Sequence, residues 1–198
     1  MWDERYAGDE YLFGTEPNAF LKAQAHLLKP GQRALAVADG EGRNGVWLAE
    51  QGLDVVSMDA SGVAIAKARK LAEARGVHPT FVQADIESWD WEAEAFDVVA
   101  AIFIQFTPPP LRDKCFAGFK KTLRPGGLLL LTGYGPKQLE YRTGGPGVLE
   151  NLYTRALLEE RFSDMDILLL DEHDSLVSEG KRHTGMSALV DLVARKRA

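Results

Sequence analysis

The chain has 198 residues, of which 45% are hydrophobic and 26% are charged, and these shares suit one globular domain around one core. Its formal net charge of -6 opposes binding to phosphate backbones and to anionic membrane surfaces, so we expect neither a nucleic acid nor a membrane as partner. Cys115 is the only cysteine, which excludes an internal disulfide and a cysteine-rich zinc site.

The remaining composition signals favour a small-molecule partner. The first residues lack a basic segment followed by an apolar stretch, and the longest aliphatic run, residues 128–131, is too short for a bilayer span. We therefore expect an unprocessed cytoplasmic protein, either a monomer or a homodimer. The sequence contains no histidine, cysteine or carboxylate cluster with metal-ligand spacing, so no metal is expected.

Short apolar strands alternate with amphipathic helices, which predicts a largely parallel α/β sheet. In the first half of the chain we expect a helix over 18–28, a strand over 33–38, a helix over 44–51, a strand over 54–59, a helix capped by Ser61 that ends at residue 75, and a strand over 80–83. In the second half we expect a strand over 96–102, a helix over 109–122, and a turn at 123–127 that leads into a fifth strand. A loop over 135–147, a short helix near 154–161, and strands over 165–171 and 186–193 should follow. The last two strands have no room for a crossover helix and should pair as an antiparallel hairpin.

A glycine-rich loop follows the first predicted strand. Residues 40–45 read Gly-Glu-Gly-Arg-Asn-Gly and match the pattern G-x-G-x-x-G. Glycines let a backbone approach a ligand closely, and the start of the next helix offers free N–H groups. Asp59, at the end of the second strand, can accept both hydroxyls of a ribose. NAD and S-adenosylmethionine both carry that ribose, so the loop alone leaves both ligands open.

Three features favour the methyl donor over the dinucleotide. A chain of this length leaves no separate substrate domain after a dinucleotide-binding half. Asp85 and Ile86 follow the third strand, where a carboxylate and a free N–H can bind the amine and a ring nitrogen of adenine; Asp85 could equally be an ordinary turn residue. The terminal hairpin is the third feature, because a half that binds NAD does not need it.

Two stretches of the chain also carry a family resemblance. The first comprises Ala34 to Asn44 (ALAVADGEGRN) with Leu48 to Gly52 (LAEQG), Val55, Asp59 and Ser61, and the second comprises Phe96 to Val99 (FDVV) and Leu123 to Gly127 (LRPGG). With them the chain resembles the class I S-adenosylmethionine-dependent methyltransferases. Residues 2–6, 11–17, 179–180 and 183–185 are similar to the tellurite-resistance and thiopurine methyltransferase-like branch, so the resemblance covers nearly the whole chain.

The resemblance implies a Rossmann-like, mostly parallel sheet of seven strands in the order 3-2-1-4-5-7-6, with strand seven antiparallel and helices on both faces. It implies a single domain over 1–198, with an N-terminal lid and helix at 1–30, a cofactor-binding core at 31–134, and a substrate-side loop and terminal hairpin at 135–198. The cofactor, S-adenosylmethionine, would lie over the carboxyl ends of strands one, two and four. The residues expected to bind it are Tyr6, Tyr11, Gly14, Ala38, Asp39, Gly40, Gly42, Arg43, Asn44, Asp59, Ala60, Ser61, Asp85, Ile86 and Ile102.

The chain departs from the family pattern in the first strand and its loop. Members usually carry an acidic residue where Ala36 stands, and glycine-cysteine where Ala38 and Asp39 stand. Our hypothesis is that Asp39 supplies negative charge near the ammonium or sulfonium of the cofactor. Arg43 would then meet the carboxylate of the cofactor.

The sequence assigns no catalytic residue, because methyl transfer from a sulfonium chiefly requires that acceptor, carbon and sulfur be held in line. Ile102 to Gln105 (IFIQ) stand where enzymes that methylate base amino groups carry Asn/Asp-Pro-Pro-Tyr, so such methylation is not expected. Candidates for the acceptor pocket are Phe13, Phe106, Tyr134, Arg142 and His183. An aromatic pocket without a strong base suits a thiol or a selenium or tellurium species, with S-adenosylhomocysteine as product. An NAD-dependent oxidoreductase and a non-catalytic S-adenosylmethionine-binding protein remain the alternatives.

Overall fold

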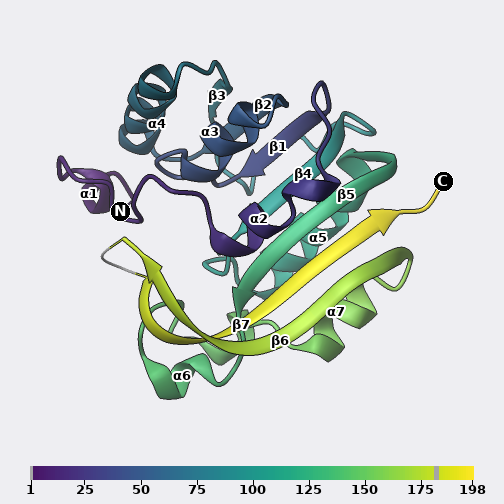
Figure 1. Ribbon diagram of the computed structural model, residues 1–198. Coiled ribbons are helices and arrows are strands. Elements are labelled where there is room, and N and C mark those ends of the chain that lie inside the picture. The colour runs from purple at the N-terminus through teal and green to yellow at the C-terminus, as the bar shows by residue number, and fades with distance from the viewer. Residues whose placement is uncertain (1, 181–182) are drawn as a thin grey trace.

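The computed structural model describes residues 2–180 and 183–198 (Figure 1). Its strands are β1 (Arg33–Val37), β2 (Asp54–Asp59), β3 (Thr80–Gln83), β4 (Phe96–Ile102), β5 (Leu123–Tyr134), β6 (Met165–Glu179) and β7 (His183–Lys196). Its helices are α1 (Trp2–Tyr6), α2 (Ala19–Ala23), α3 (Arg43–Glu50), α4 (Gly62–Arg75), α5 (Pro109–Thr122), α6 (Gln138–Tyr141) and α7 (Arg155–Arg161), with single 3₁₀ turns at Ala25–Leu27 and Leu149–Asn151.

The seven strands form one sheet in the order β3-β2-β1-β4-β5-β7-β6, as predicted. Strands β1 to β5 are parallel to their neighbours, whereas β7 runs antiparallel to both β5 and β6. The predicted terminal hairpin is therefore confirmed. Because β1 and β4 are adjacent but are followed by connections that lead in opposite directions, the sheet has a switch point at their carboxyl ends, which is where such folds bind ligands.

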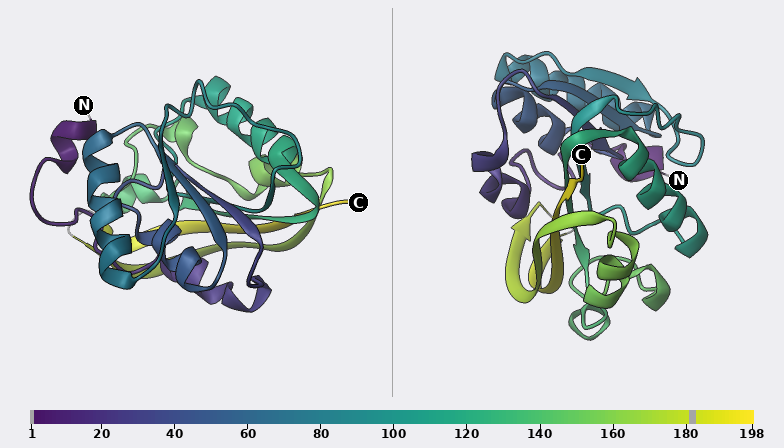
Figure 2. Two further views of the ribbon diagram at one scale, coloured as in Figure 1. Left: turned by 90° about the horizontal axis from the view of Figure 1, so that it is seen from above. Right: turned by 90° about the vertical axis from the view of Figure 1, so that its right-hand side faces the viewer.

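Helices cover both faces of the sheet, as the two views of Figure 2 show. The core on one face includes Phe116 and Phe119 of α5 and Phe162 after α7. The core on the other face includes Leu21 of α2 and Trp47 of α3. Successive strand residues alternate between the two cores because side chains in a strand point to opposite faces. No helix joins β3 to β4, and residues 84–95 make this connection as turns.

The predicted helix over 18–28 and the predicted turn at 123–127 were wrong in extent. The helix expected over 18–28 stops at Ala23, where the N–H of Gln24 bonds to the carbonyls of Leu21 and Lys22, and a 3₁₀ turn follows. Residues 123–127 belong to β5 rather than to a separate turn, although the register with β4 shifts between Phe96 and Val98.

The terminal strands are longer than expected, and the loop over 135–147 contains the short helix α6. Many residues of the strand extensions are polar because the hairpin projects beyond the core, so apolar runs could not reveal them. In the described parts of the chain, every helix is too short or too polar to cross a membrane.

Candidate functional site

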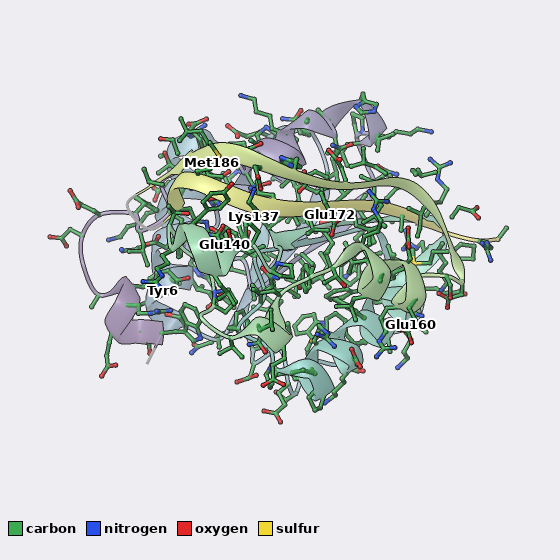
Figure 3. The ribbon with its side chains drawn as sticks, turned by 90° about the horizontal axis from the view of Figure 1, so that it is seen from below. Tyr6, Lys137, Glu140, Glu160, Glu172 and Met186 are labelled. Atoms are coloured by element: carbon green, nitrogen blue, oxygen red, sulfur yellow. The ribbon has the colours of Figure 1, made fainter. Side chains whose placement is uncertain are left out.

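A cleft of about 960 Å³ opens at the carboxyl ends of β1, β2 and β4, where the glycine loop begins. Side chains from α1, the glycine loop, β5 and the start of β7 enclose it, so segments from the whole chain meet there. Tyr6 of α1 marks one end of this region, and α6, with Glu140 and the preceding Lys137, lies against the hairpin that carries Met186 (Figure 3).

Asp59 anchors the glycine loop. One carboxylate oxygen accepts the N–H of Gly40 at 2.8 Å, and the other accepts the N–H of Ser61 at 2.8 Å. Each oxygen keeps a free lone pair, and the side chain lines the cleft, so it can also accept ribose hydroxyls. Burial raises the pKa of Asp59, while the two N–H groups oppose that shift.

Asp39 lies deeper under the loop. Its Oδ2 accepts the N–H of Gly45 at 3.0 Å and the hydroxyl of Ser57 at 2.9 Å. Burial raises the pKa of Asp39 to about 7, because two hydrogen bonds do not replace the lost hydration of the carboxylate. The side chain still lines the cleft, so a cationic group placed there would favour its ionised form.

Arg43 is committed to an ion pair. Its Nη2 lies 2.7 Å from Oε2 of Glu179, and both side chains are nearly buried. The other oxygen of Glu179 accepts the side-chain amide of Asn18 at 2.9 Å. The pair thus joins the glycine loop, the start of α2 and the end of β6 at the edge of the cleft.

The N-terminal segment is pinned over the loop by two carboxylates. Glu41 accepts the N–H of Leu12 at 2.7 Å and the ammonium of Lys67 at 2.7 Å. Asp3 accepts the hydroxyl of Ser61, the residue that also caps α4. Residues 2–13 therefore lie closed over the side of the cleft that carries Asp59.

An aromatic cage closes the opposite end. The ring of His183 lies 4.6 Å from that of Phe13, 4.5 Å from that of Phe103 and 5.8 Å from that of Tyr134, measured between centroids. Burial lowers the pKa of His183 to about 4, so its imidazole is neutral near pH 7. Nδ1 of His183 and the hydroxyl of Tyr134 are buried without a partner among the described residues. Two orphaned polar atoms beside apolar rings are the arrangement that an acceptor molecule would complete.

The structure brings most of the sequence-predicted site residues together. The cleft is lined by the predicted cofactor residues Tyr6, Ala38, Asp39, Gly40, Arg43, Asn44, Asp59, Ala60, Asp85, Ile86 and Ile102, and by all five acceptor candidates, Phe13, Phe106, Tyr134, Arg142 and His183. Asp85 is exposed, and its carboxylate accepts the N–H of Glu87, so it also serves as a turn residue.

Four predicted cofactor residues lie off the cleft surface. Tyr11 donates to the carbonyl of Lys67, and Ser61 caps α4. Gly14 lines a second, smaller cavity. Gly42 has a left-handed φ of 85°, and a Cβ there would lie 2.5 Å from that of Ala68, so its glycine serves the packing of α3 on α4.

Sequence reasoning missed Phe103 and Gln105 as site residues. Phe103 has a φ of 55°, which is strained for an aromatic residue, and its ring lies 4.7 Å from Tyr134. The buried amide of Gln105 donates to the carbonyl of Tyr134 at 2.8 Å and accepts its N–H. The signal lies in the run Ile102 to Gln105, of which the sequence analysis assigns only Ile102 to the site.

Fold and cleft together define a Rossmann-like domain of the class I methyltransferase type. Residues 34–127 match the family model described as "Methyltransferase domain". This match identifies a methyltransferase domain in residues 34–127, and the fold is that of the class I S-adenosylmethionine-dependent methyltransferases, as the sequence predicted.

Two curated relatives support this assignment. The chain is 31% identical over 134 residues to a demethylmenaquinone methyltransferase of Thermus thermophilus, a match that covers 67% of this chain and 59% of the relative. It is 32% identical over 107 residues to an uncharacterized methyltransferase of Synechocystis, covering 52% and 48%. The matched region thus spans only about half to three fifths of these relatives.

Solved structures share the fold. A protein from work on the conversion of a disulfide bond into a thioacetal group during echinomycin biosynthesis superposes with a TM-score of 0.79 at 18% identity, covering 99% of this chain and 91% of that one. TehB from Haemophilus influenzae superposes with a TM-score of 0.75 at 17% identity, covering 99% and 66%. At this identity the likeness concerns the fold alone, and it agrees with the fold expected from the predicted branch.

The donor set of the cleft fits S-adenosylmethionine. Asp59 offers lone pairs that a ribose could use, and Asp85 and Ile86 line the same cleft, where a carboxylate and an N–H would suit an adenine. Asp39 faces the cleft from below, where a sulfonium or ammonium would offset its burial. These residues would hold the cofactor, which supplies a methyl group on a positively charged sulfur.

Proposed function

We propose that this protein transfers the methyl group of S-adenosylmethionine to a small acceptor with a soft nucleophile, either a thiol or a selenium or tellurium species. The observation that carries the proposal is that the Asp59 cradle and the His183 cage lie in one continuous cleft. A cofactor held by the first would direct its reactive end toward the second, where aromatic faces attract a sulfonium.

His183 and Tyr134 suit a thiol acceptor. A neutral imidazole can accept the proton that a thiol loses when its sulfur bonds to the methyl carbon. The hydroxyl of Tyr134 can donate to the incoming nucleophile. Phe13 and Phe103 exclude water around the reacting sulfur, and Arg142, which is exposed at the rim of the cleft, can bind an anionic group of the acceptor.

Calorimetric titration tests the choice of cofactor. We expect S-adenosylhomocysteine to bind and NAD not to bind. Asp59→Ala should weaken S-adenosylhomocysteine binding by about 1.5–3 kcal/mol, the range for a hydrogen bond to a charged group. Asp54→Ala, an exposed carboxylate at the opposite end of the same strand, should leave binding unchanged. Tight NAD binding would instead support an oxidoreductase.

An acceptor screen tests turnover. The protein is incubated with labelled donor and a panel of thiols, selenite, tellurite and demethylmenaquinone, the last because of the Thermus thermophilus relative, and S-adenosylhomocysteine is measured against a reaction without protein. We expect product with a thiol, selenite or tellurite. His183→Gln should lower kcat with the thiol and leave the affinity for S-adenosylhomocysteine within about twofold. Cofactor binding without turnover on any acceptor would favour a regulatory binding protein.

A further inference from the structure

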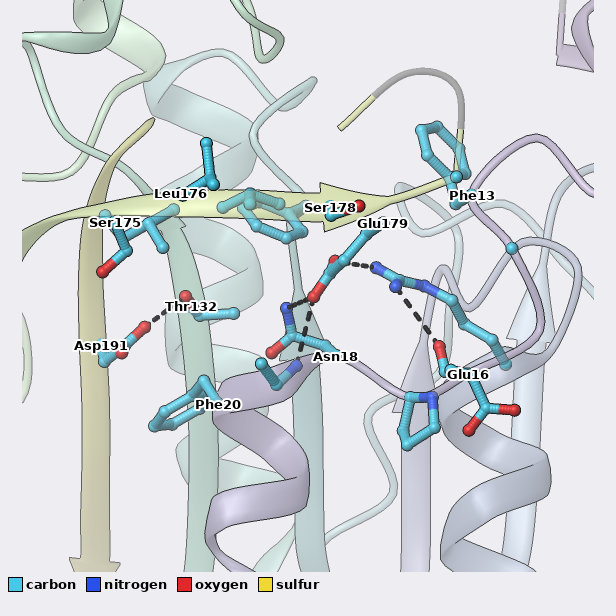
Figure 4. A pocket seen from close by; sticks show the side chains of 18 of the residues that line it. Phe13, Glu16, Asn18, Phe20, Thr132, Ser175, Leu176, Ser178, Glu179 and Asp191 are labelled. Carbon is cyan, nitrogen blue, oxygen red and sulfur yellow. Dashed lines mark hydrogen bonds and ion pairs between the residues drawn. The ribbon is translucent and has the colours of Figure 1, made fainter. Parts of the chain in front are cut away.

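A second cavity, of about 450 Å³, lies between the N-terminal segment and the terminal hairpin; we call it the hairpin chamber (Figure 4). It is lined by residues 13–20, Arg43, Phe103, Thr132, His173, residues 175–180, Leu189 and Asp191. It exists because α2 ends at Ala23 and covers only part of the sheet face formed by β5, β7 and β6. Its volume is within the range of roughly 300–1,000 Å³ that is usual for small-molecule sites.

A few side chains separate the chamber from the cleft described above. The buried ion pair between Arg43 and Glu179 stands in this wall, as Figure 4 shows at the end of β6. Phe13 and Phe103 line both cavities. In contrast, Phe20 and Leu176 line only the chamber, so they report on its occupancy without interference from the cleft.

The floor of the chamber is a chain of polar groups on a sheet face that otherwise packs apolar residues. Thr132 donates to Oδ1 of Asp191 at 2.5 Å, and Nε2 of His173 lies 2.8 Å from Oδ2 of Asp191. Nδ1 of His173 lies 2.7 Å from the hydroxyl of Ser175. Thr132 and Asp191 are almost completely buried. A buried carboxylate in the middle of a strand costs stability, and nothing in the strand pairing requires it.

This chain of hydrogen bonds has one direction. A carboxylate only accepts, so Asp191 accepts hydrogen bonds from the hydroxyl of Thr132 and from Nε2–H of His173. When Nε2 of His173 carries the proton, Nδ1 is an acceptor, and the hydroxyl of Ser175 donates a hydrogen bond to it. The hydroxyls of Thr132 and Ser175 and the N–H of His173 therefore all donate within the floor. Only acceptor lone pairs remain to face the chamber.

The charges of the chamber favour the same kind of ligand. Within the residues that the structure describes, Asp191 forms an ion pair with His173 alone, and a histidine carries a charge only when it is protonated. Arg43, the guanidinium that lines the chamber, is already paired with Glu179. The walls add the aromatic faces of Phe13, Phe20 and Phe103, which attract cations.

From this geometry we infer that the hairpin chamber is a second binding site, for a small organic cation in which an ammonium group is attached to an apolar ring or short chain. The ammonium donates to Ser175 and Asp191 at the floor, and the apolar body lies against Phe20 and Leu189. The inference does not depend on methyl transfer, since none of the floor residues takes part in the proposed reaction.

The test uses benzylamine as the probe, with benzyl alcohol and benzoate as neutral and anionic probes of nearly the same shape, at mildly alkaline pH in the presence of saturating S-adenosylhomocysteine. Binding is followed by NMR through the ring protons of His173 and through contacts to Phe20 and Leu176. We expect saturable shifts with benzylamine, at an affinity about tenfold or more above that for either other probe. Absence of saturable shifts with benzylamine, or equal binding of benzoate, would show that the chamber is not a cation site.

Asp191→Asn is the decisive variant because an amide at this position reverses the direction of the hydrogen bonds along the floor. Its NH₂ donates to Nε2 of His173, so Nδ1 carries the proton and the hydroxyl of Ser175 is released to donate into the chamber. Benzylamine affinity should fall about tenfold or more, while benzyl alcohol should bind at least as well as before. Unchanged benzylamine affinity overturns the inference.

Ser175→Ala keeps the inference testable if Asp191→Asn fails to fold, because Ser175 lies at the partly exposed rim of the floor. It removes one acceptor and should weaken benzylamine severalfold without changing S-adenosylhomocysteine affinity. Equal affinity in Ser175→Ala and the parent protein would exclude the floor as the binding group. Failure of S-adenosylhomocysteine itself to bind would reject the proposed function and leave the cation site to be judged by the benzylamine data alone.

Discussion

Arg43, the first residue of α3, forms a 2.7 Å ion pair with Glu179, the last residue of β6, across 136 positions of sequence. Only 8% and 12% of these side chains are exposed. The pair joins the glycine loop to the tip of the hairpin and stands in the wall between the two cavities. Its strength therefore bears on both stability and ligand access.

Glu179→Gln should lower the free energy of unfolding by about 2–4 kcal/mol, because it leaves the Arg43 charge buried without compensation. Urea denaturation measures this change. Glu159→Gln is the matched control, since Glu159 pairs with Arg155 at an exposed 3.6 Å contact that is worth about 0.5 kcal/mol or less. Equal losses in the two variants would mean that solvent already screens the Arg43 pair.

The same variant tests whether Arg43 can meet the carboxylate of the cofactor. In Glu179→Gln the guanidinium is free to bind that carboxylate, so saturating S-adenosylhomocysteine should raise the melting temperature more in the variant than in the parent protein. Thermal melts with and without S-adenosylhomocysteine give the comparison. Equal increments would assign Arg43 a structural role only.

Gly42→Ala and Gly31→Ala separate backbone strain from helix packing. Both glycines have a φ near 85°, so alanine at either position costs about 1–2 kcal/mol. A Cβ at residue 31 meets nothing within 4 Å, whereas one at residue 42 lies 2.5 Å from Cβ of Ala68 and forces α3 away from α4. Gly42→Ala should therefore lose about 1–3 kcal/mol more than Gly31→Ala in urea denaturation. Similar losses would show that the two helices can separate freely.

These relationships indicate how far the sequence could predict the structure. The boundaries of β2, β3, β4 and α5 agree with the expected ranges because buried apolar runs and prolines mark them directly. The extensions of β6 and β7 could not be predicted, because they contain no apolar run. In β6, exposed positions alternate there with less exposed ones that line the hairpin chamber, such as His173 and Ser175. The strand order followed from the family resemblance rather than from periodicity.

The site divides in the same way. The glycine loop and Asp59 line the cleft as predicted, since each follows the end of a recognisable strand, and the five acceptor candidates also line it. Glu179, the partner of Arg43, could not be predicted, because it lies 136 positions further along the sequence and the residues around it show no sign of the pairing. Gly42 was assigned to ligand approach, whereas its position against Ala68 shows that a motif glycine can also serve helix packing.

Asp39→Asn should reduce the pH dependence of cofactor binding. With its pKa raised to about 7, Asp39 is largely protonated at about pH 6 and ionised at about pH 8. A cationic group of the cofactor stabilises the carboxylate, so affinity for S-adenosylhomocysteine should rise across that interval in the parent protein and stay flatter in the variant. Calorimetry at the two pH values measures both. An identical rise in Asp39→Asn would place the cation away from Asp39.

The pKa shifts of Asp39 and His183 also predict opposing effects on stability. The pKa of Asp39 is raised from about 4 in the unfolded chain to about 7, so the folded state holds an extra proton between these values and stability falls as pH rises through them. The pKa of His183 is lowered from about 6.5 to about 4, so the unfolded chain holds the extra proton and stability rises with pH over that interval. Each slope is at most about 1.4 kcal/mol per pH unit, and the two nearly cancel between about pH 4 and 6.5.

Single variants should therefore expose one slope each. Relative to the parent protein, Asp39→Asn should gain stability as pH rises from about 4 to 7, reaching on the order of 1–3 kcal/mol, because a buried carboxylate no longer has to lose its proton. His183→Gln should lose stability relative to the parent protein from about pH 4 to 6.5, because the parent gains stability there as its unfolded chain gives up the proton of His183, and the variant has no such gain. Urea denaturation at several pH values resolves both trends. If the difference in free energy of unfolding between Asp39→Asn and the parent protein were constant with pH, Asp39 would have an ordinary pKa. The buried carboxylate of Asp39 would then cost the folded protein no stability that depends on its charge.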